Sequence, residues 1–439
     1  MSEKKSNIAG AAAVGLALAL VCGGAAYLFS GGELGKGFSA ATEKITIRNY
    51  GEDFSDAATG ITVNYNEADG EKDGAKSPEE LGEVSIPYAA DYFLSYLSEK
   101  ERLVCSQIYS GFRSFETDID ITDGVVRSED ICKFIVLCTS CAPEFSYIGQ
   151  EYSVSVDSEG YVMSIEVNFT RTPEEAAQRY DKTADNIDRI LSGISPDMSD
   201  YDKFLYIHDE IVKNCVYDET AENCYTAYGC LTEGRAVCEG YSKALLMLCE
   251  KAGIGCLPVI GQGIDDGEAT PHIWNKVLLD GQWYCTDLTW DDPVSDMGGE
   301  YYRYDYFALT DAEFAADHSM DENMYLNYPQ AVSEEANYYK RNGFFADSSE
   351  SCPQTVSFAV NYAMDNGLDY ARIKCSDRAV FDSCVNDIFI KEYENGNARI
   401  FSILKESAER HPESGYSYGS YSIIKNEETF TLTVKLASE

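Results

Sequence analysis

Two apolar runs flank the dipeptide Asp280-Gly281, and this pattern predicts a β-hairpin with a two-residue turn. A two-residue turn fixes which residues of the two strands face each other, and counting outward places Trp274 opposite Asp287. His272 and Asp287 then share one face as diagonal neighbours, roughly 7–8 Å apart at the backbone, so imidazole and carboxylate can meet. A three-residue turn would shift the register by one residue and move Asp287 to the other face.

Cys238 is expected at the first turn of a helix. Apolar residues repeat at helical spacing after it, and Gly253 directly after a final apolar and basic stretch is a typical helix stop. The unpaired amides and the positive dipole end at a helix start stabilise a thiolate and can hold a developing oxyanion. A nucleophile, an imidazole and a carboxylate are the parts that thiol catalysis requires.

The residues around this site resemble the transglutaminase-like superfamily. Its bacterial members carry a Gly-x-x-Val-Cys-x-Gly-Tyr helix start, a His-x-Trp-Asn strand and a Trp-Tyr-x-x-Asp-x-Thr-Trp-Asp-Asp-Pro strand, and all three occur here in this order. The resemblance covers about residues 200–310, and Tyr306-Phe307 and His318 beyond it are similar to the usual tail of such domains. It implies a papain-like α+β fold, in which a helix bearing the cysteine packs on an antiparallel sheet bearing the histidine and aspartate.

By their places in these motifs, Cys238 would be the nucleophile, His272 the general base and acid, and Asp287 the residue that orients the imidazole. Ile273, where alanine is common in the family, is a small departure that casts little doubt on the triad. The reaction would pass through a cysteine thioester formed on a protein or peptide amide. An amine acceptor would give cross-linking and water would give proteolysis or deamidation, and the sequence favours neither. No cofactor and no metal ligand set is predicted.

A second class of function is a non-catalytic binding or scaffolding module at the cell surface or cell wall. The 32 tyrosines of the chain suit a peptide or glycan surface. A pure binding module has no need of an intact triad, so the three motifs favour the enzyme. His208 lies on the apolar face of an expected helix and is interpreted as a core histidine.

The N-terminus predicts export. Residues 8–29 form an uncharged run long enough to span a bilayer, and Lys4 and Lys5 ahead of it place the remainder outside the cell. We expect an uncleaved, single-pass signal anchor, whereas cleavage near residues 39–41 would give a secreted protein. The formal net charge of −41 argues against nucleic acid as a partner.

Composition and patterning divide the chain into five segments of overall α+β class. We expect an N-terminal anchor or signal segment at 1–30 and an acidic flexible linker at 31–82. An α+β region at 83–195 holds two capped helices and a hairpin, the transglutaminase-like domain spans 196–335, and a small α+β accessory domain of unknown role spans 336–439.

The chain contains 15 cysteines. Apart from Cys22 in the N-terminal run and Cys238, 13 remain, and an odd number without regular spacing is more typical of small buried residues than of a disulfide framework. One or two disulfides are still compatible with the pattern. Cys138 and Cys141 form the only C-x-x-C, which without a second pair is weak support for zinc or redox chemistry.

Overall fold

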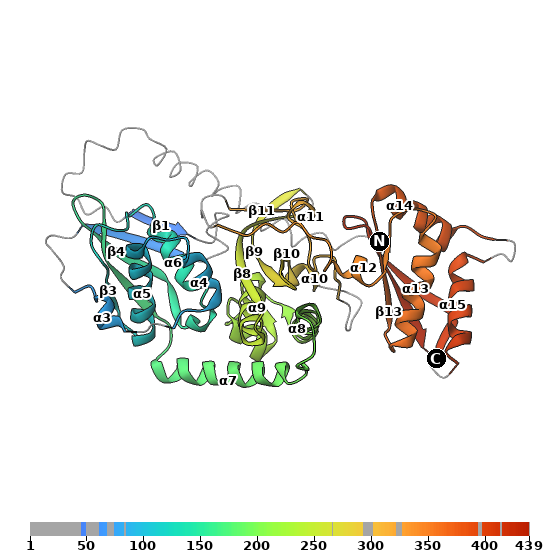
Figure 1. Cartoon of the computed structure of the whole chain (residues 1–439), viewed down its shortest axis with the longest axis horizontal. Coiled ribbons are helices and arrows are strands. Elements are labelled where there is room, and N and C mark those ends of the chain that lie inside the picture. Colours follow the sequence, from blue (N-terminus) through green and yellow to red (C-terminus); the bar gives the residue numbers. More distant parts are fainter. Residues whose placement is uncertain are drawn as a thin grey trace, which may run out of the picture. The chain divides into compact units, whose positions relative to one another are not determined.

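The structure is a computed structural model. It describes the backbone of 45–49 and 61–67, and it describes fully the ranges 74–82, 85–265, 267–292, 302–321, 327–393, 397–412 and 415–437, with the backbone of 438. The chain separates into two compact units (Figure 1). Unit 1 comprises Met1–Tyr302 with Thr310–Val332, and unit 2 comprises Arg303–Leu309 with Ser333–Glu439.

The predicted membrane segment at 8–29, the alternative cleavage site and Cys22 lie outside the described residues. Among the helices that the structure describes, none combines the length and the apolar character needed to cross a membrane.

The first sheet of unit 1 has five strands in the order β1-β2-β4-β5-β3. β4 and β5 form the predicted hairpin, and Gly160 between them has a φ of 84°, which favours glycine. The strands are β1 (Ile45–Asn49), β2 (Ile61–Glu67), β3 (Asp118–Asp120), β4 (Ile148–Val156) and β5 (Val162–Phe169).

β1 and β2 depart from the expectation that residues 31–82 form an extended linker. They pair antiparallel with each other, and β2 also pairs parallel with β4. Their sequences, Ile-Thr-Ile-Arg-Asn and Ile-Thr-Val-Asn-Tyr-Asn-Glu, alternate apolar or β-branched residues with polar ones, which is typical of a half-buried strand. The acidic composition around these short segments hides that local signal.

Two helices of this region carry the predicted N-terminal caps. Ser98 caps α5 in a reciprocal capping box with Glu101, and Thr172 caps α7 in the same way with Glu175. Each box satisfies two backbone amides that a helix start leaves unpaired. The helices are α3 (Pro78–Leu81), α4 (Tyr88–Leu94), α5 (Glu99–Ser114), α6 (Ile131–Ser140), α7 (Pro173–Leu191) and α8 (Asp200–Asn214).

The second sheet of unit 1 is fully antiparallel, in the order β10-β9-β8-β11, and carries the predicted site. The helix α9 packs on β8 and β9, and α8 packs on α9 (Figure 1). This arrangement confirms the mixed α+β class with a transglutaminase-like core. The elements are β6 (Val216–Tyr217), β7 (Arg235–Ala236), α9 (Cys238–Ala252), β8 (Gly255–Asp265), β9 (Glu268–Leu279), β10 (Gln282–Thr286), α10 (Leu288–Asp291), α11 (Asp311–Phe314) and β11 (His318–Met320).

Unit 2 is a four-stranded sheet in the order β12-β13-β15-β14, with α13 on β13 and α15 on β14. Its core includes the segment 303–309, where buried Asp305 accepts hydrogen bonds from the hydroxyls of Tyr339 at 2.7 Å and Thr429 at 2.8 Å. The elements are α12 (Tyr338–Arg341), β12 (Phe345–Ala346), α13 (Cys352–Asp365), β13 (Tyr370–Cys375), α14 (Arg378–Cys384), the π-helix η4 (Val385–Ile390), α15 (Arg399–Arg410), β14 (Tyr416–Asn426) and β15 (Thr431–Ser438).

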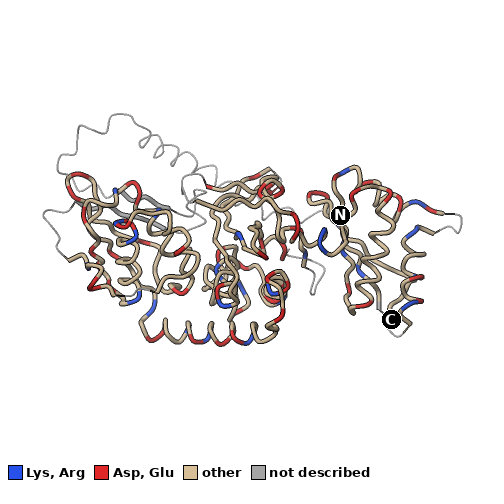
Figure 2. The backbone as a smooth tube through the Cα atoms, in the orientation of Figure 1, with Lys and Arg blue, Asp and Glu red and all other residues tan. Residues whose placement is uncertain are grey.

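Among the residues that the structure describes, Asp and Glu occur along many elements of both units (Figure 2). The charge of −41 is therefore a general property of the chain. A dispersed negative charge favours solubility and repels anionic polymers.

Candidate active site

Cys238 is the first residue of α9, as predicted. Its helix start is held by two glycines that no other residue can replace without strain. Gly234 has a φ of 68°, and a Cβ on Gly240 would lie 2.4 Å from the carbonyl oxygen of Cys224. The glycines of the Gly-x-x-Val-Cys-x-Gly motif thus let the start of α9, which carries the Cys238 thiol, pack closely against neighbouring backbone. Cys238 keeps partial exposure, whereas nearly all other described cysteines are buried.

The hairpin has the predicted register. Gln282 pairs with Leu279, and Asp280 and Gly281 have φ angles of 48° and 85°. Two successive positive φ values define a type I′ turn, which matches the twist of the flanking strands. The pairing continues outward without a shift to the end of β10, and Asp287 follows directly after that strand.

His272 and Asp287 are in direct contact. The His272 Nε2 atom lies 2.5 Å from the Asp287 Oδ2 atom, and both side chains are buried. The other carboxylate oxygen of Asp287 accepts hydrogen bonds from the backbone amides of Thr289 at 2.8 Å and Trp290 at 3.3 Å. Asp287 is therefore the N-cap of α10 as well as the partner of His272, so one short helix fixes the position of the carboxylate.

The thiol of Cys238 interacts with the imidazole of His272 and is one of the groups that raise the pKa of His272. Burial alone would lower the pKa of His272, but the charge and hydrogen bond of Asp287, together with Cys238, outweigh it and raise that pKa to about 10. In turn the imidazole holds the pKa of Asp287 well below its usual range, against the effect of burial.

His318, which the sequence indicated only as part of the tail of such a domain, is a further member of this cluster. Its Nε2 atom lies 3.1 Å from the Asp287 Oδ2 atom, and its Nδ1 atom lies 2.6 Å from the Asp317 Oδ1 atom. Asp287 thus bridges two imidazoles. His318 lies on β11, opposite Gly263 of β8, and no spacing rule predicts that this short strand joins the sheet beside β8.

His208 is buried, as predicted for a core histidine, but it has a polar role. Its two ring nitrogens lie 3.2 Å from carboxylate oxygens of Asp209 and Asp291. Burial lowers the pKa of His208, but the hydrogen bonds to these carboxylates raise it by more than burial lowers it. The net shift of the pKa is therefore upward. The next acid, Asp292, accepts a 2.5 Å hydrogen bond from the Tyr241 hydroxyl. The Asp-Asp pair therefore ties α10 to α8 and α9.

Aromatic rings enclose the imidazoles. The ring of Trp290 lies 5.5 Å from that of His272 and 4.4 Å from that of His318, and the ring of Trp274 lies 6.1 Å from that of His272. A Cβ on Gly263 would lie 2.7 Å from the Trp290 ring, so this glycine makes room for the indole. Apolar walls of this kind reduce the access of water and strengthen the electrostatic pairing between His272 and Asp287.

The family model of the transglutaminase-like superfamily matches residues 188–288. That range contains Cys238, His272 and Asp287. The chain carries a transglutaminase-like domain. No curated protein matches the chain.

Several solved structures are similar to parts of the chain. A candidate cysteine protease from Cytophaga hutchinsonii is 22% identical over 25% of this chain and 39% of its own, with a TM-score of 0.22. A TGase is 16% identical over 35% and 48%, with a TM-score of 0.24. A candidate protease from Parabacteroides distasonis is 11% identical over 32% and 43%, with a TM-score of 0.19. The chain matches less than half the length of each of them.

The cluster in the transglutaminase-like domain also contains ligand atoms that a metal ion could use. One ligand atom from each of His272, Asp287 and His318 lies within 4.8 Å of the others. Two imidazoles and a carboxylate are donors that zinc accepts. A metal ion bound there would occupy the atoms that orient His272, and it would therefore compete with the pairing of His272 and Asp287.

Proposed function

We propose that the transglutaminase-like domain catalyses acyl transfer from protein or peptide amides through a thioester on Cys238. The observation that carries this proposal is that the His272 imidazole contacts the Asp287 carboxylate and interacts with the Cys238 thiol. An imidazole with a raised pKa next to a thiol favours the thiolate–imidazolium pair, which is the reactive state of a cysteine nucleophile.

In the first half-reaction the Cys238 sulfur attacks the amide carbonyl carbon, and the carbonyl oxygen becomes an oxyanion near the amides at the start of α9. The His272 imidazolium donates its proton to the leaving nitrogen, the C–N bond breaks, and a thioester and an amine are formed. In the second half-reaction neutral His272 takes a proton from the acceptor, which attacks the thioester and releases the Cys238 thiolate, so that the thiolate–imidazolium pair is restored. Asp287 holds the imidazole in place in both steps.

The acceptor is an amine or water, because the same triad serves both reactions. With an amine the domain would cross-link proteins, and with water it would act as a protease or deamidase. We place the reaction outside the cytoplasm, on surface or cell-wall proteins, because residues 8–29 have the length and composition of a signal anchor. The dispersed acidic charge supports partners other than nucleic acid.

The reactivity of Cys238 tests the proposal without knowledge of the substrate. The full chain would be labelled with iodoacetamide over a pH series, and the labelled peptides would be quantified by mass spectrometry. We expect rapid labelling of Cys238 below about pH 7, and slower labelling in a His272→Ala variant. Cys132→Ala is a matched control, because Cys132 is also only partly buried. The proposal would be contradicted if Cys238 were labelled only above about pH 8 and at the same rate in the His272→Ala variant.

A second set of reactions separates the two acceptors. The full chain would be incubated with a glutamine-containing peptide, with and without a primary amine, and the products would be weighed by mass spectrometry. Incorporation of the amine indicates cross-linking. In the reaction without added amine, release of ammonia or cleavage of the peptide indicates hydrolysis. If Cys238 is unreactive and peptides still bind reversibly, the domain is a binding module, which is the second class that the tyrosine content suggests.

A further inference from the structure

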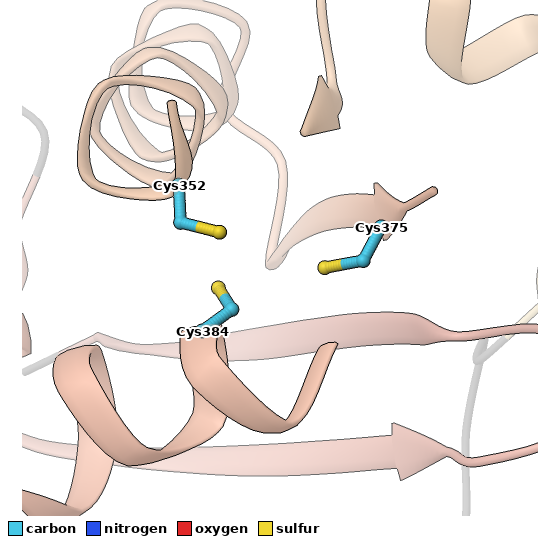
Figure 3. A group of neighbouring side chains, drawn as sticks. All are labelled: Cys352, Cys375 and Cys384. Carbon is cyan, nitrogen blue, oxygen red and sulfur yellow. The ribbon is translucent and has the colours of Figure 1, made fainter. Parts of the chain in front are cut away.

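Unit 2 contains three cysteines whose sulfur atoms converge on one point (Figure 3). Cys352 is the first residue of α13, Cys375 is the last residue of β13, and Cys384 is the last residue of α14. The three sulfur atoms lie within 4.8 Å of one another, and all three residues are at most 1% exposed. Residues separated by up to 32 positions are thus brought together by three different elements.

The convergence sets these cysteines apart from other buried cysteines. Cys138 also lies beside Cys105 and Cys141 in unit 1, yet these three do not form such a triangle. Across the residues that the structure describes, only two groups of three such ligand atoms lie within 4.8 Å of one another. One is this cysteine triangle, and the other is the cluster around Asp287. Packing of small apolar side chains in a core does not require three thiols to point toward one another.

The size of the triangle suits a thiophilic cation. Zinc bonds to cysteine sulfur at about 2.3 Å, so three sulfurs around one zinc ion lie roughly 3.8–4.0 Å apart in tetrahedral or trigonal geometry. Sulfurs already within 4.8 Å of one another need only small rotations to reach that spacing. A disulfide would use two of the three sulfurs and leave the third, whereas a cation uses all of them.

The electrostatics favour a cation as well. Cys352 opens a helix of 14 residues, and the positive end of its dipole stabilises a thiolate there. The carboxylates of Asp377 and Asp387 act electrostatically on Cys375 and Cys352. Several thiolates close to further negative charge repel one another unless a positive charge lies between them.

We propose that Cys352, Cys375 and Cys384 form a structural site for a thiophilic divalent cation of the zinc type. Three protein sulfurs leave one position of a tetrahedral ion for a water molecule or another donor. The ion would join α13, β13 and α14 of unit 2 and would stabilise the folded state by the free energy of its binding. This site is independent of the proposed acyl transfer in unit 1.

Metal titration of the full chain tests this site. The protein would be reduced, freed of metal with a chelator, and titrated with Co(II), whose thiolate charge-transfer absorption reports sulfur ligands; Zn(II) would then be added. We expect one equivalent of Co(II) per chain, displaced by one equivalent of Zn(II). Cys375→Ala and Cys384→Ala should lose that equivalent. Cys138→Ala, which removes a buried thiol beside two other cysteines, and His318→Ala, which disrupts the other candidate cluster, should keep it.

X-ray absorption on the unmutated, zinc-loaded chain makes the test independent of how well the variants fold. We expect three sulfur neighbours at about 2.3 Å. A shell of nitrogen and oxygen alone, charge transfer that survives both Cys375→Ala and Cys384→Ala, or no bound Co(II) at all would overturn the proposal. A disulfide between two of the three cysteines in freshly isolated, unreduced protein that contains no metal would overturn it as well.

Discussion

Two cysteines in the described part of the chain begin a helix, and their surroundings differ. Cys238 opens α9 in unit 1 and is partly exposed, with an imidazole beside its sulfur. Cys352 opens α13 in unit 2 and is buried, with two further thiols beside it. The helix dipole acts on both sulfurs in the same way. The neighbouring side chains therefore decide whether such a thiol is suited to attack a carbonyl or to bind a cation.

The largest effect on the reactivity of Cys238 is expected when His272, the imidazole beside it, is removed. His272→Ala deprives Cys238 of its proton partner, and loss of a general acid and base costs roughly 10²–10⁴-fold in rate. We expect acyl transfer, or labelling of Cys238 near neutral pH, to fall within that range. Cys352→Ala provides the comparison and should leave the labelling rate of Cys238 unchanged. Equal rates in the His272→Ala variant and the unmutated chain would show that the helix start alone activates the thiol.

Asp287→Asn should reduce stability in a manner that depends on pH. The pKa of His272 is raised from its ordinary 6.5 to about 10, so its pairing stabilises the fold fully below pH 6.5 and less and less as the pH rises toward 10. The pKa of Asp287 is lowered from its ordinary 3.8, so its contribution is present above pH 3.8 and is lost on acidification. The stabilisation by the pair is therefore greatest between these two ordinary values.

Loss of one partner of a buried pair costs about 3–5 kcal/mol, and urea unfolding of Asp287→Asn and the unmutated chain would measure it. We expect the difference in unfolding free energy to be largest near pH 5–6 and to shrink toward pH 10. Asp317→Asn serves as a control, because its carboxylate lies beside His318 and is not among the groups that shift the pKa of His272. A difference that is constant across this range would mean that His272 is not protonated in the folded state.

Gly240→Ala tests the close packing that presents Cys238. The added Cβ would lie 2.4 Å from the Cys224 carbonyl oxygen and 2.8 Å from the Cβ of Ala236, so the start of α9 must shift. Overpacking of this kind costs about 1–3 kcal/mol, and we expect slower labelling of Cys238 together with a lower thermal midpoint. Gly253→Ala at the other end of α9 strains a positive φ of 77° but meets no atom within 4 Å. That control should lower the midpoint without slowing the labelling.

The sequence predicted the features that depend on local pattern. The Asp280-Gly281 turn sets the hairpin register by itself, and the apolar spacing and Gly253 set both ends of α9. These two elements carry the three predicted site residues, so local rules were enough to bring His272 and Asp287 together. The contact with Cys238 needs α9 to pack on the sheet, and only the motif resemblance implied that packing.

The features that the sequence missed depend on contacts between distant segments. β1 and β2 are short strands in an acidic stretch, and the pairing of β2 with β4 crosses more than 80 residues. His318 reaches Asp287 only because β11 adds to the free edge of β8. The triangle of Cys352, Cys375 and Cys384 has no regular spacing, since each sulfur comes from a different element. Such juxtapositions have no periodic signature in a single sequence.

The smallest predicted effect concerns His318, which we regard as a positioning residue because it contacts Asp287 and acts on the thiol only through His272. A hydrogen bond to a charged group contributes about 1.5–3 kcal/mol, and only part of it bears on the orientation of His272. We expect His318→Ala to slow labelling of Cys238 by roughly tenfold, which corresponds to about 1.4 kcal/mol. His318→Gln, which can still donate to Asp287, should recover part of the rate. Because a merely structural loss would slow labelling equally at every pH, a shift of the pH profile is the decisive measurement, and its absence would leave Asp287 held by α10 alone.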